Sequence, residues 1–596
     1  MVMPLLKIAA SLLLFVSSFS LTVAVTTNDD NVFDFIVIGG GTAGCVLTTR
    51  LCQSLPHAKI AILEQGAERT TEQDLRTRAL GLTRELSLGY EPLTIVHLSE
   101  PNQALFDADI TNTSGRIISM YEMKSMGGGS NVAWQWEIPL NGTYETWGIE
   151  GFDSETGLAA MAKAAQAIQP QQPPASLQYT YAQDILDAYE SAGFDVLDTA
   201  GPKGSGGKTA YLNVVPANPG GERQTSWTSY LQPALMNECA GNVHLIQGAF
   251  VSKILISPSS ETNNTVAEGV EFINTNGQTE TIMATREVLV SAGPFGTPRL
   301  LQLSGIGDGQ VLRDAGVDEI VVDLPVGLKT LVRPIGIVPI LYTGVPLFPE
   351  VNVTSRLSNE TIQQFNNGEG GLLGFALSSV IGKVGDVGFH TVLMSLPGAD
   401  NQPLLAGACI LNAKSTGNIT IKTSNPTTEL SVHSNLLEGN DFADMISCVR
   451  QVTEAYVNLT STLGAAVLAP LDVENFAGYI SASTETSWHV VGASRPGEVI
   501  DGATFKVLGF ENLRICDASV MPEFPVSAGP LTSVYALSEF LSDKMVAEYK
   551  NEYGADSSPT QTPTDSPTQQ PMDFPTQTPT SGVAKVLTFS FVLITV

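Results

Sequence analysis

Residues 33–66 read FDFIVIGGGTAGCVLTTRLCQSLPHAKIAILEQG, and they decide the fold. An apolar run ends in glycines, of which Gly39, Gly41 and Gly44 fit the pattern G-x-G-x-x-G. A second apolar run ends at Glu64, twenty residues after the last of these glycines. This order of strand, glycine loop, helix, strand and acid is typical of a dinucleotide-binding βαβ unit.

Each position of this unit has a physical reason. The first glycine permits the tight turn out of the strand, the second lets a pyrophosphate approach the backbone, and the third lets the helix pack close to the strand. The helix N-terminus offers free N–H groups and a partial positive charge to the phosphates. The acid can accept hydrogen bonds from a ribose hydroxyl. The predicted cofactor contacts in this stretch are Gly39, Gly41, Thr42, Ala43, Gly44 and Glu64.

Composition and charge narrow the class of protein. The chain has 596 residues, of which 43% are hydrophobic and 15% charged, as in a globular protein with a large core. Sixty acidic residues against thirty basic ones give a formal charge of −30. This charge repels the phosphates of nucleic acids and of anionic membrane surfaces, so we expect no nucleic-acid partner.

The N-terminus indicates the secretory pathway. Lys7 precedes an apolar run that ends at Val23, and residues 1–24 resemble a signal peptide, with a membrane anchor as the alternative. Glycosylation sequons follow it, so we expect a secreted or cell-surface glycoprotein. The sequons begin at Asn112, Asn141, Asn263, Asn352, Asn359, Asn418 and Asn458.

The six cysteines show no C-x-x-C pair and no zinc-ligand spacing, so no metal site is predicted. Cys45 and Cys52 lie seven residues apart on the first predicted helix, and we interpret both as core residues. An oxidising compartment permits a disulfide among the others, but their spacing assigns no pair. These others are Cys239, Cys409, Cys448 and Cys516.

The composition changes abruptly near the C-terminus. Residues 554–581 are rich in Ser, Thr and Pro and cannot bury a core, so we predict an extended stalk. Residues 582–596 form an apolar tail, whose uninterrupted part is shorter than the roughly 20 residues that span a bilayer. A stalk before such a tail resembles a lipid-anchor signal, which would attach the protein to the cell surface. The alternative is a tail that simply ends the chain.

Strand-like and helix-like patterns alternate near both ends of the body, whereas its middle, residues 330–480, is richer in β-like runs. The patterns predict a helix over 158–169 and strands over 243–256, 268–273 and 288–290. They indicate a nucleotide-binding domain assembled from separated segments, together with an inserted substrate domain.

Four further blocks extend the first one. SMGGGSNVAWQW, residues 125–136, contains glycines that let the backbone approach a ligand closely. GPFGTPRLLQLSGIG, residues 293–307, is a loop that starts a short apolar helix. In VHLIQGAFVSKIL, Val251 lies on a strand edge whose backbone could pair with an adenine. The fourth block is SWHVVGASRPG, followed by LRICDASVMP.

Over residues 33–545 these blocks resemble the glucose–methanol–choline family of FAD-dependent oxidoreductases, and residues 293–307 match its second signature at every defined position. The resemblance implies an α/β fold: a Rossmann-like FAD-binding domain built from discontinuous segments, plus an α+β substrate domain with an antiparallel sheet. The implied FAD-binding segments are 30–150, 206–330 and 481–553, and the implied substrate-domain segments are 151–205 and 331–480.

The resemblance also implies where FAD lies. In the family the cofactor crosses the first glycine loop, the second glycine loop and an Asp-Ala pair near the C-terminus, and a strand residue contacts the adenine. The matching positions in this sequence are Gly127, Gly128, Gly129, Val251, Asp517 and Ala518.

The family's usual reaction is the oxidation of a small-molecule alcohol. A base takes the hydroxyl proton while a hydride passes to flavin N5, so the flavin does the redox chemistry. The position of His489 in SWHVVG implies that it is the base, and the near-neutral pKa of histidine suits that role. The electron acceptor, oxygen or a quinone-like compound, stays open.

The catalytic side departs from the family pattern. The family places a second His or Asn ten residues before a glutamate of the last helix, and counting back from Glu539 reaches Gly529. Glycine has no side chain to hydrogen-bond a substrate oxygen, so a water, a backbone group or a side chain such as Ser527 would have to replace it. Three smaller departures are Ala133, Pro496 and the segment KTLVRP, residues 329–334.

Other functions therefore stay open beside an alcohol oxidase or dehydrogenase. A hydroxynitrile-lyase-like enzyme would keep the flavin as a structural group and use histidine for acid–base chemistry. A non-catalytic flavoprotein is favoured by Gly529 and by the stalk, whereas no residue set singles out a photoenzyme that decarboxylates fatty acids. A nicotinamide enzyme fits the first glycine loop alone but not the other blocks.

Overall fold

The computed structural model describes residues 31–553 apart from gaps. The predicted signal peptide, stalk and tail lie outside the described residues, as do Ser527 and the sequons at Asn112, Asn141, Asn263 and Asn352. The gaps are 84–85, 87–89, 106–114, 140–141, 175–176, 178–181, 198–207, 261, 263, 343–356, 375–377, 385–386, 396–402, 464, 468–472 and 526–528.

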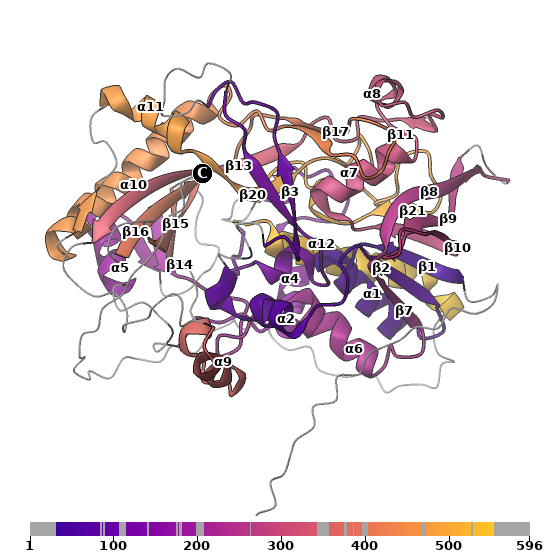
Figure 1. Ribbon diagram of the computed structural model, residues 1–596, viewed down its shortest axis with the longest axis horizontal. Coiled ribbons are helices and arrows are strands. Elements are labelled where there is room, and N and C mark those ends of the chain that lie inside the picture. The colour runs from indigo at the N-terminus through magenta and orange to yellow at the C-terminus, as the bar shows by residue number, and fades with distance from the viewer. Residues whose placement is uncertain are drawn as a thin grey trace, which may run out of the picture.

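The first lobe is built on a mixed sheet whose strands run in the order β7-β2-β1-β10-β9-β8, with β21 paired to β10 (Figure 1). Its centre is parallel, because β1 pairs in parallel with both β2 and β10, as the glycine-loop unit predicts. The strands are β1 (Val32–Ile38), β2 (Ile60–Glu64), β7 (Val243–Gln247), β8 (Phe250–Pro258), β9 (Thr265–Ile273), β10 (Thr279–Val290) and β21 (Leu513–Ile515).

Helices from distant parts of the chain cover this sheet. The first helix, α1 (Thr42–Ser54), packs against the last, α12 (Leu531–Tyr553), which also packs against α4 (Ser154–Ile168). The predicted helix 158–169 thus begins four residues earlier, because the Asp153 carboxylate accepts from the Thr156 amide and caps it. Helix α7 (Gly293–Leu303) contacts β8 of this sheet, and three further helices of the chain are α2 (Thr71–Arg78), α6 (Gln232–Met236) and α8 (Gly309–Asp314).

The second lobe is built on a largely antiparallel sheet in the order β19-β13-β16-β15-β14-β6-β5, with β20 paired to β13 (Figure 1). Helix α10 (Asp441–Leu463) packs against β13 and β16 and also contacts α5 (Ala182–Ser191) and α11 (Val473–Ser483). The strands are β5 (Asp195–Leu197), β6 (Lys208–Leu212), β13 (Leu331–Tyr342), β14 (Ser378–Val384), β15 (Val387–Ser395), β16 (Pro403–Ile410), β19 (Ala465–Val467) and β20 (Glu485–Val491).

Smaller elements complete the chain. Three short two-stranded sheets pair β3 (Thr94–Leu98) with β4 (Ser119–Met123), β11 (Ile306–Gly307) with β12 (Val322–Asp323), and β17 (Asn418–Ile421) with β18 (Leu430–His433). One further helix is α9 (Asn359–Asn366).

This architecture confirms the predicted fold class, a Rossmann-like domain from discontinuous segments beside a domain with an antiparallel sheet. Two strands lie on the other side of the expected division. β6 falls within 206–330 and β20 within 481–553, yet both pair in the second sheet. The reason is that each strand finds its hydrogen-bond partners in the chain segment 331–384.

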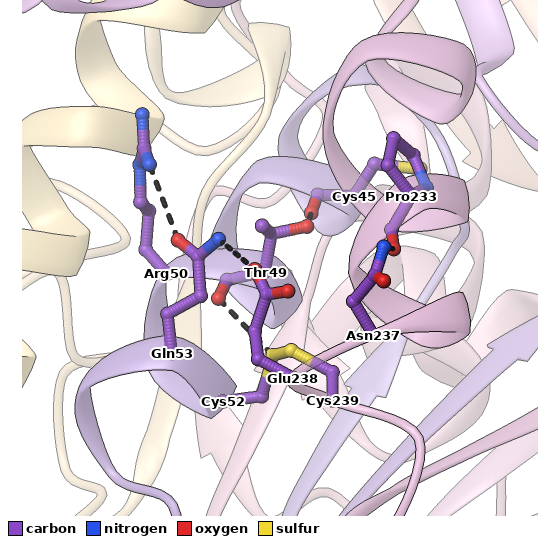
Figure 2. Close-up of a disulfide and its surroundings, with 9 residues drawn as sticks. All are labelled: Cys45, Thr49, Arg50, Cys52, Gln53, Pro233, Asn237, Glu238 and Cys239. Carbon is purple, nitrogen blue, oxygen red and sulfur yellow. Dashed lines mark hydrogen bonds between the residues drawn. A yellow bond between two sulfur atoms is a disulfide. The ribbon is translucent and has the colours of Figure 1, made fainter.

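Two disulfides correct the interpretation of the cysteines. Cys52, at the end of α1, is buried but bonded to Cys239, and Figure 2 shows this bond beside the Gln53–Glu238 hydrogen bond of 2.6 Å. Cys409 of β16 is bonded to Cys448 of α10. Cys45 is a free, buried thiol, as expected for a core residue, and Cys516 is free and buried as well.

None of the helices described is both long enough and apolar enough to cross a membrane.

Candidate active site

The two glycine loops touch each other at the carboxyl end of β1. The Gly127 amide donates to the Gly40 carbonyl at 2.7 Å. A Cβ added to Gly128 would lie 2.7 Å from the Cα of Gly41, so a side chain at Gly128 would force the loops apart. The structure thus brings the first and second glycine blocks together, as the sequence predicted.

The glycines of the two loops divide into two kinds. A Cβ on Gly39 would lie 2.4 Å from the Ser291 oxygen, and one on Gly44 would lie 1.9 Å from the Gly39 oxygen, so packing alone requires glycine there. At Gly41 an added Cβ would meet protein only at 3.9 Å. Exposed Gly129 has nothing within 4 Å of that position. Packing does not explain these two glycines, whereas close approach of a ligand to the backbone does.

The N-terminus of α1 opens onto this space. Gly41 is its N-cap and provides no side-chain cap. The amides of Thr42, Ala43 and Gly44 meet no hydrogen-bond acceptor in the part of the chain that the structure describes. Donors of this kind at a helix N-terminus bind phosphate, so the residues fit the pyrophosphate of a dinucleotide.

Glu64 ends β2 and is 6% exposed. Its Oε2 accepts from the Gly40 amide at 2.9 Å and its Oε1 from the Gly66 amide at 2.8 Å. Burial raises the pKa of Glu64 to about 7, against the lowering effect of these two hydrogen bonds. Each oxygen keeps a lone pair with which it can accept from a ribose hydroxyl.

Val251 lies on β8, the last strand in the order of the sheet. The turn before it is tied to the end of β2, because the Ala249 amide donates to the Glu64 carbonyl at 2.9 Å and the Gly248 amide to the Gly66 carbonyl at 3.0 Å. The residues predicted for ribose and adenine are therefore neighbours.

Asp517 follows β21 and organises two segments at the same edge of the sheet. Its Oδ2 accepts from the Gly293 amide at 2.9 Å and from the Thr297 hydroxyl at 2.6 Å, which fixes the start of α7. Its Oδ1 accepts from the Ser519 amide at 2.8 Å, just after Ala518. Burial raises the pKa of this carboxyl above its ordinary value. The Asp-Ala pair and the second signature thus meet beside the first glycine loop.

His489 lies on an irregular part of β20. The register between β20 and β13 shifts at this point, and Trp488 has a left-handed backbone with φ 61°. Such a bulge turns a side chain out of the regular alternation of the strand. It is stabilised by a hydrogen bond from the Trp488 amide to the Thr486 hydroxyl at 3.0 Å.

Ser487 orients the imidazole. Its hydroxyl donates to the Arg333 carbonyl at 3.2 Å and lies 3.2 Å from His489 Nδ1. A serine carries one hydroxyl proton, so the oxygen accepts from Nδ1–H while it donates to the carbonyl. The neutral imidazole then has its lone pair on Nε2, which is the state that a general base requires.

The Cε1–Nε2 edge of the imidazole lies beside the position where the family pattern is broken. A Cβ added to Gly529 would lie 3.7 Å from His489 Nε2 and 3.5 Å from the side-chain nitrogen of Gln135. Gln135 is 7% exposed and comes from the second glycine block. Sequence reasoning missed Gln135, Ser487 and Arg333, although all three stand within or beside the blocks that it quoted.

Arg333 stands in the departing segment KTLVRP and is fully buried. Its guanidinium donates to the Pro525 carbonyl at 3.1 Å and to Asn412, and it lies over the Phe524 ring. Burial lowers the pKa of Arg333 to about 9. This arginine ties β13, which carries the Ser487 acceptor, to the segment that precedes Gly529.

The chain is similar to known proteins in both sequence and fold. Two models of the GMC oxidoreductase family match residues 33–335 and 413–538. Ecdysone oxidase of Spodoptera littoralis is 24% identical over 87% of this chain and 92% of its own. Glucose dehydrogenase (FAD, quinone) of Drosophila pseudoobscura pseudoobscura is 25% identical over 88% of each chain. The crystal structure of formate oxidase has a TM-score of 0.73 at 19% identity and covers 87% of this chain and 99% of that one.

Proposed function

Since the chain belongs to the GMC oxidoreductase family and is an FAD-dependent oxidoreductase, we propose that it oxidises a small-molecule alcohol with His489 as the base. The observation that carries the proposal is the position of the imidazole, which stands on a β-bulge, is oriented by Ser487 and has its Cε1–Nε2 edge beside Gly529.

The reaction balances with the groups at hand. His489 Nε2 takes the hydroxyl proton, the carbinol carbon loses a hydride and the product is an aldehyde or ketone. Bound FAD supplies the acceptor for that hydride. Oxygen or a quinone-like compound would then take up the two electrons. Two relatives, ecdysone oxidase and glucose dehydrogenase (FAD, quinone), support this choice of acceptors.

The cofactor residues form part of the same proposal. We assign the pyrophosphate to Gly41, Gly129 and the N-terminus of α1, the ribose to Glu64 and the adenine to Val251. The free amides of α1 and the two glycines that packing leaves unexplained support the first assignment. The link between the β2 end and the β7–β8 turn supports the other two.

Anaerobic reduction of the bound flavin tests the reaction. The purified protein is mixed with each of five alcohols in turn, and the flavin absorption at about 450 nm is followed. The alcohols are ecdysone, glucose, choline, benzyl alcohol and 1-octanol. Bleaching by at least one alcohol is expected. If no alcohol bleaches the flavin but mandelonitrile releases an aldehyde, the protein is a lyase and not an alcohol-oxidising enzyme. Absence of both would favour a non-catalytic flavoprotein.

The role of His489 is tested with matched variants. His489→Ala should slow flavin reduction by about 10²–10⁴-fold, the usual contribution of a general base. His433→Ala, which removes an exposed histidine of β18, serves as the control and should reduce its flavin at the normal rate. Equal rates in both variants would remove the imidazole from the mechanism.

We further propose that the protein is secreted or displayed at the cell surface as a glycoprotein. Two disulfides support an oxidising compartment, and the sequon at Asn359 starts with an exposed side chain. Attachment through the C-terminal tail belongs to the same proposal. Release of the protein from intact cells by a phospholipase that cuts lipid anchors would support attachment, and its presence in the medium alone would support secretion.

A further inference from the structure

Alcohol oxidation needs two polar groups at the substrate oxygen. The base removes the proton, and a second group must stabilise the negative charge that develops on the oxygen as the proton leaves. His489 supplies the first group in the function proposed above, and Gly529, where the family pattern expects the second, has no side chain. The inference below rests on that function and concerns the missing group.

Gln135 borders the same space from the other side. The position of an added Gly529 Cβ lies 3.5 Å from Gln135 Nε2, 3.5 Å from His489 Cε1 and 3.7 Å from His489 Nε2, so both side chains border the place where a side chain at position 529 would begin. The oxygen of a substrate bound beside His489 on this side of Gly529 can therefore come within reach of the Gln135 amide as well.

The backbone on both sides of Gln135 is fixed. The Trp136 amide donates to the Val214 carbonyl at 2.7 Å, and the Trp134 carbonyl accepts from Asn213 at 3.0 Å. The Ala133 carbonyl accepts from buried Arg223 at 2.9 Å. These bonds hold the segment without using the Gln135 side chain, so its amide is aimed at the space in advance of a ligand.

The amide itself is unusual for a buried group. Gln135 is 7% exposed, and its Oε1 has no hydrogen-bond partner within the described residues. Buried amides are nearly always hydrogen-bonded, because an unpaired polar atom loses its interactions with water and gains none. The protein around Gln135 therefore gives no structural reason for a polar side chain at this place.

We propose that Gln135 is the second catalytic group, which donates an Nε2–H hydrogen bond to the substrate oxygen while His489 removes its proton. The amide compensates for the loss of a side chain at Gly529. It carries no charge and does not titrate, so it can stabilise the developing alkoxide without competing with the imidazole for the proton.

The first test compares Gln135→Leu with the unchanged holoenzyme. Leucine is of similar size but cannot donate, so kcat/KM for the fastest alcohol of the panel should fall by about 10- to 100-fold. Binding is measured separately with 2-phenyl-2-propanol and 2-methyl-2-propanol, tertiary alcohols that have a hydroxyl but no hydride to lose. Their dissociation constants, read from the flavin spectrum, should rise in Gln135→Leu.

The second test moves the amide to the family's position. Gly529 lacks a left-handed φ, and an added Cβ there meets only ordinary contacts, so Gly529→Asn is sterically acceptable. In the double variant Gln135→Leu/Gly529→Asn, an amide returns to the same space from the opposite side, and kcat/KM should recover by about 10-fold. A purely structural role of Gln135 would not be rescued in this way.

The outcomes separate this inference from the proposed function. Normal kcat/KM and normal tertiary-alcohol binding in Gln135→Leu, with an active unchanged enzyme, would overturn the inference and leave alcohol oxidation in place. Loss of FAD from Gln135→Leu with unchanged alcohol affinity at saturating FAD would also overturn it. If no alcohol bleaches the flavin of the unchanged protein, the proposed function is wrong. If, in addition, the tertiary alcohols bind neither the unchanged protein nor Gln135→Leu, the inference about Gln135 is wrong as well.

Discussion

Glu64 is a buried carboxylate at the place where the cofactor ribose is expected, and its own chemistry makes a prediction. The pKa is raised from 4.5 to about 7, mainly by burial. A carboxyl whose pKa is raised on folding makes its full contribution to the free energy of unfolding below pH 4.5. That contribution is lost as the pH rises through about 7. Its size is on the order of 3 kcal/mol.

We therefore expect a pH-dependent difference between the FAD-free protein and its Glu64→Gln variant. The melting temperature of the unchanged apoprotein should fall relative to the variant between pH 4.5 and 7 and stay level above that range. Differential scanning fluorimetry at half-unit pH steps measures this. A difference that is the same at every pH would show that Glu64 does not titrate in this range.

Gly529 allows a second prediction about the space between His489 and Gln135. Gly529→Ala places a methyl group 3.5 Å from the Gln135 nitrogen, within ordinary contact of both side chains. The fold and FAD content should not change, but KM for a secondary alcohol should rise by about 10-fold or more because the oxygen site is narrowed. Gly478→Ala on exposed α11 is the matched control, and an equal KM in both variants would contradict the prediction.

Much of the candidate cofactor site could be proposed from single residues, because its glycines and acid stand at fixed spacings in one segment. The substrate site could not. Gln135 is far from His489 in the chain and has no conspicuous spacing, so its role depends on a meeting that only the folded chain creates. The orientation of His489 by Ser487 was equally hidden, since it involves a bulge in β20 that arises from the pairing with β13, a distant part of the chain.

Among the elements, the contact of β10, β21 and α12 depends on a buried ion pair. Arg514 of β21 donates to both oxygens of Glu287 at 2.6 and 2.7 Å, and to Glu548 of α12 at 2.6 Å. Tyr549 donates to Glu287 at 2.7 Å as well. Glu287 is 0% exposed, so its charge relies on these partners.

Arg514→Met should lower the free energy of unfolding by about 3–5 kcal/mol, because it leaves the buried Glu287 charge unpaired. The double variant Arg514→Met/Glu287→Leu should lose much less, since it removes both charges together. Guanidinium unfolding followed by tryptophan fluorescence measures the two changes. Equal losses in the single and double variants would mean that packing, and not charge, dominates this contact.

Local sequence patterns predicted the helices and strands better than they predicted which strands pair. The predicted helix at 158–169 lies at 154–168, and the predicted strand at 288–290 is the end of the longer β10. The type of each element was therefore predicted correctly, but its first and last residues were not. β6 and β20 were assigned to the wrong lobe because their pairing is set by strands elsewhere in the chain. No local pattern encodes a register between distant strands.

At the scale of the whole molecule, the nucleotide-binding lobe is assembled from segments that are far apart in sequence. β1, β10 and β21 lie side by side in one sheet, and the last helix closes over the first. Such an assembly places Gly39, Ser291 and Asp517 at one edge, and it depends on long-range contacts that a covalent link can reinforce. The Cys52–Cys239 disulfide joins the end of α1 to the chain just before β7, across 187 residues (Figure 2).

This disulfide should therefore stabilise the nucleotide-binding lobe more than a bond that closes a short loop. In the chain-entropy view, linking residues 187 apart removes more freedom from the unfolded chain than linking Cys409 and Cys448, which are 39 apart. Cys52→Ser/Cys239→Ser should lose about 2–5 kcal/mol of stability, and the loss should be larger than that of Cys409→Ser/Cys448→Ser.

Alkylation and peptide mass mapping should find Cys45 and Cys516 as the thiols that react only after unfolding, because both are buried and free. A pairing of Cys45 with Cys239, or a smaller loss from the longer loop, would show that the link does not hold the first helix in the way that its position indicates.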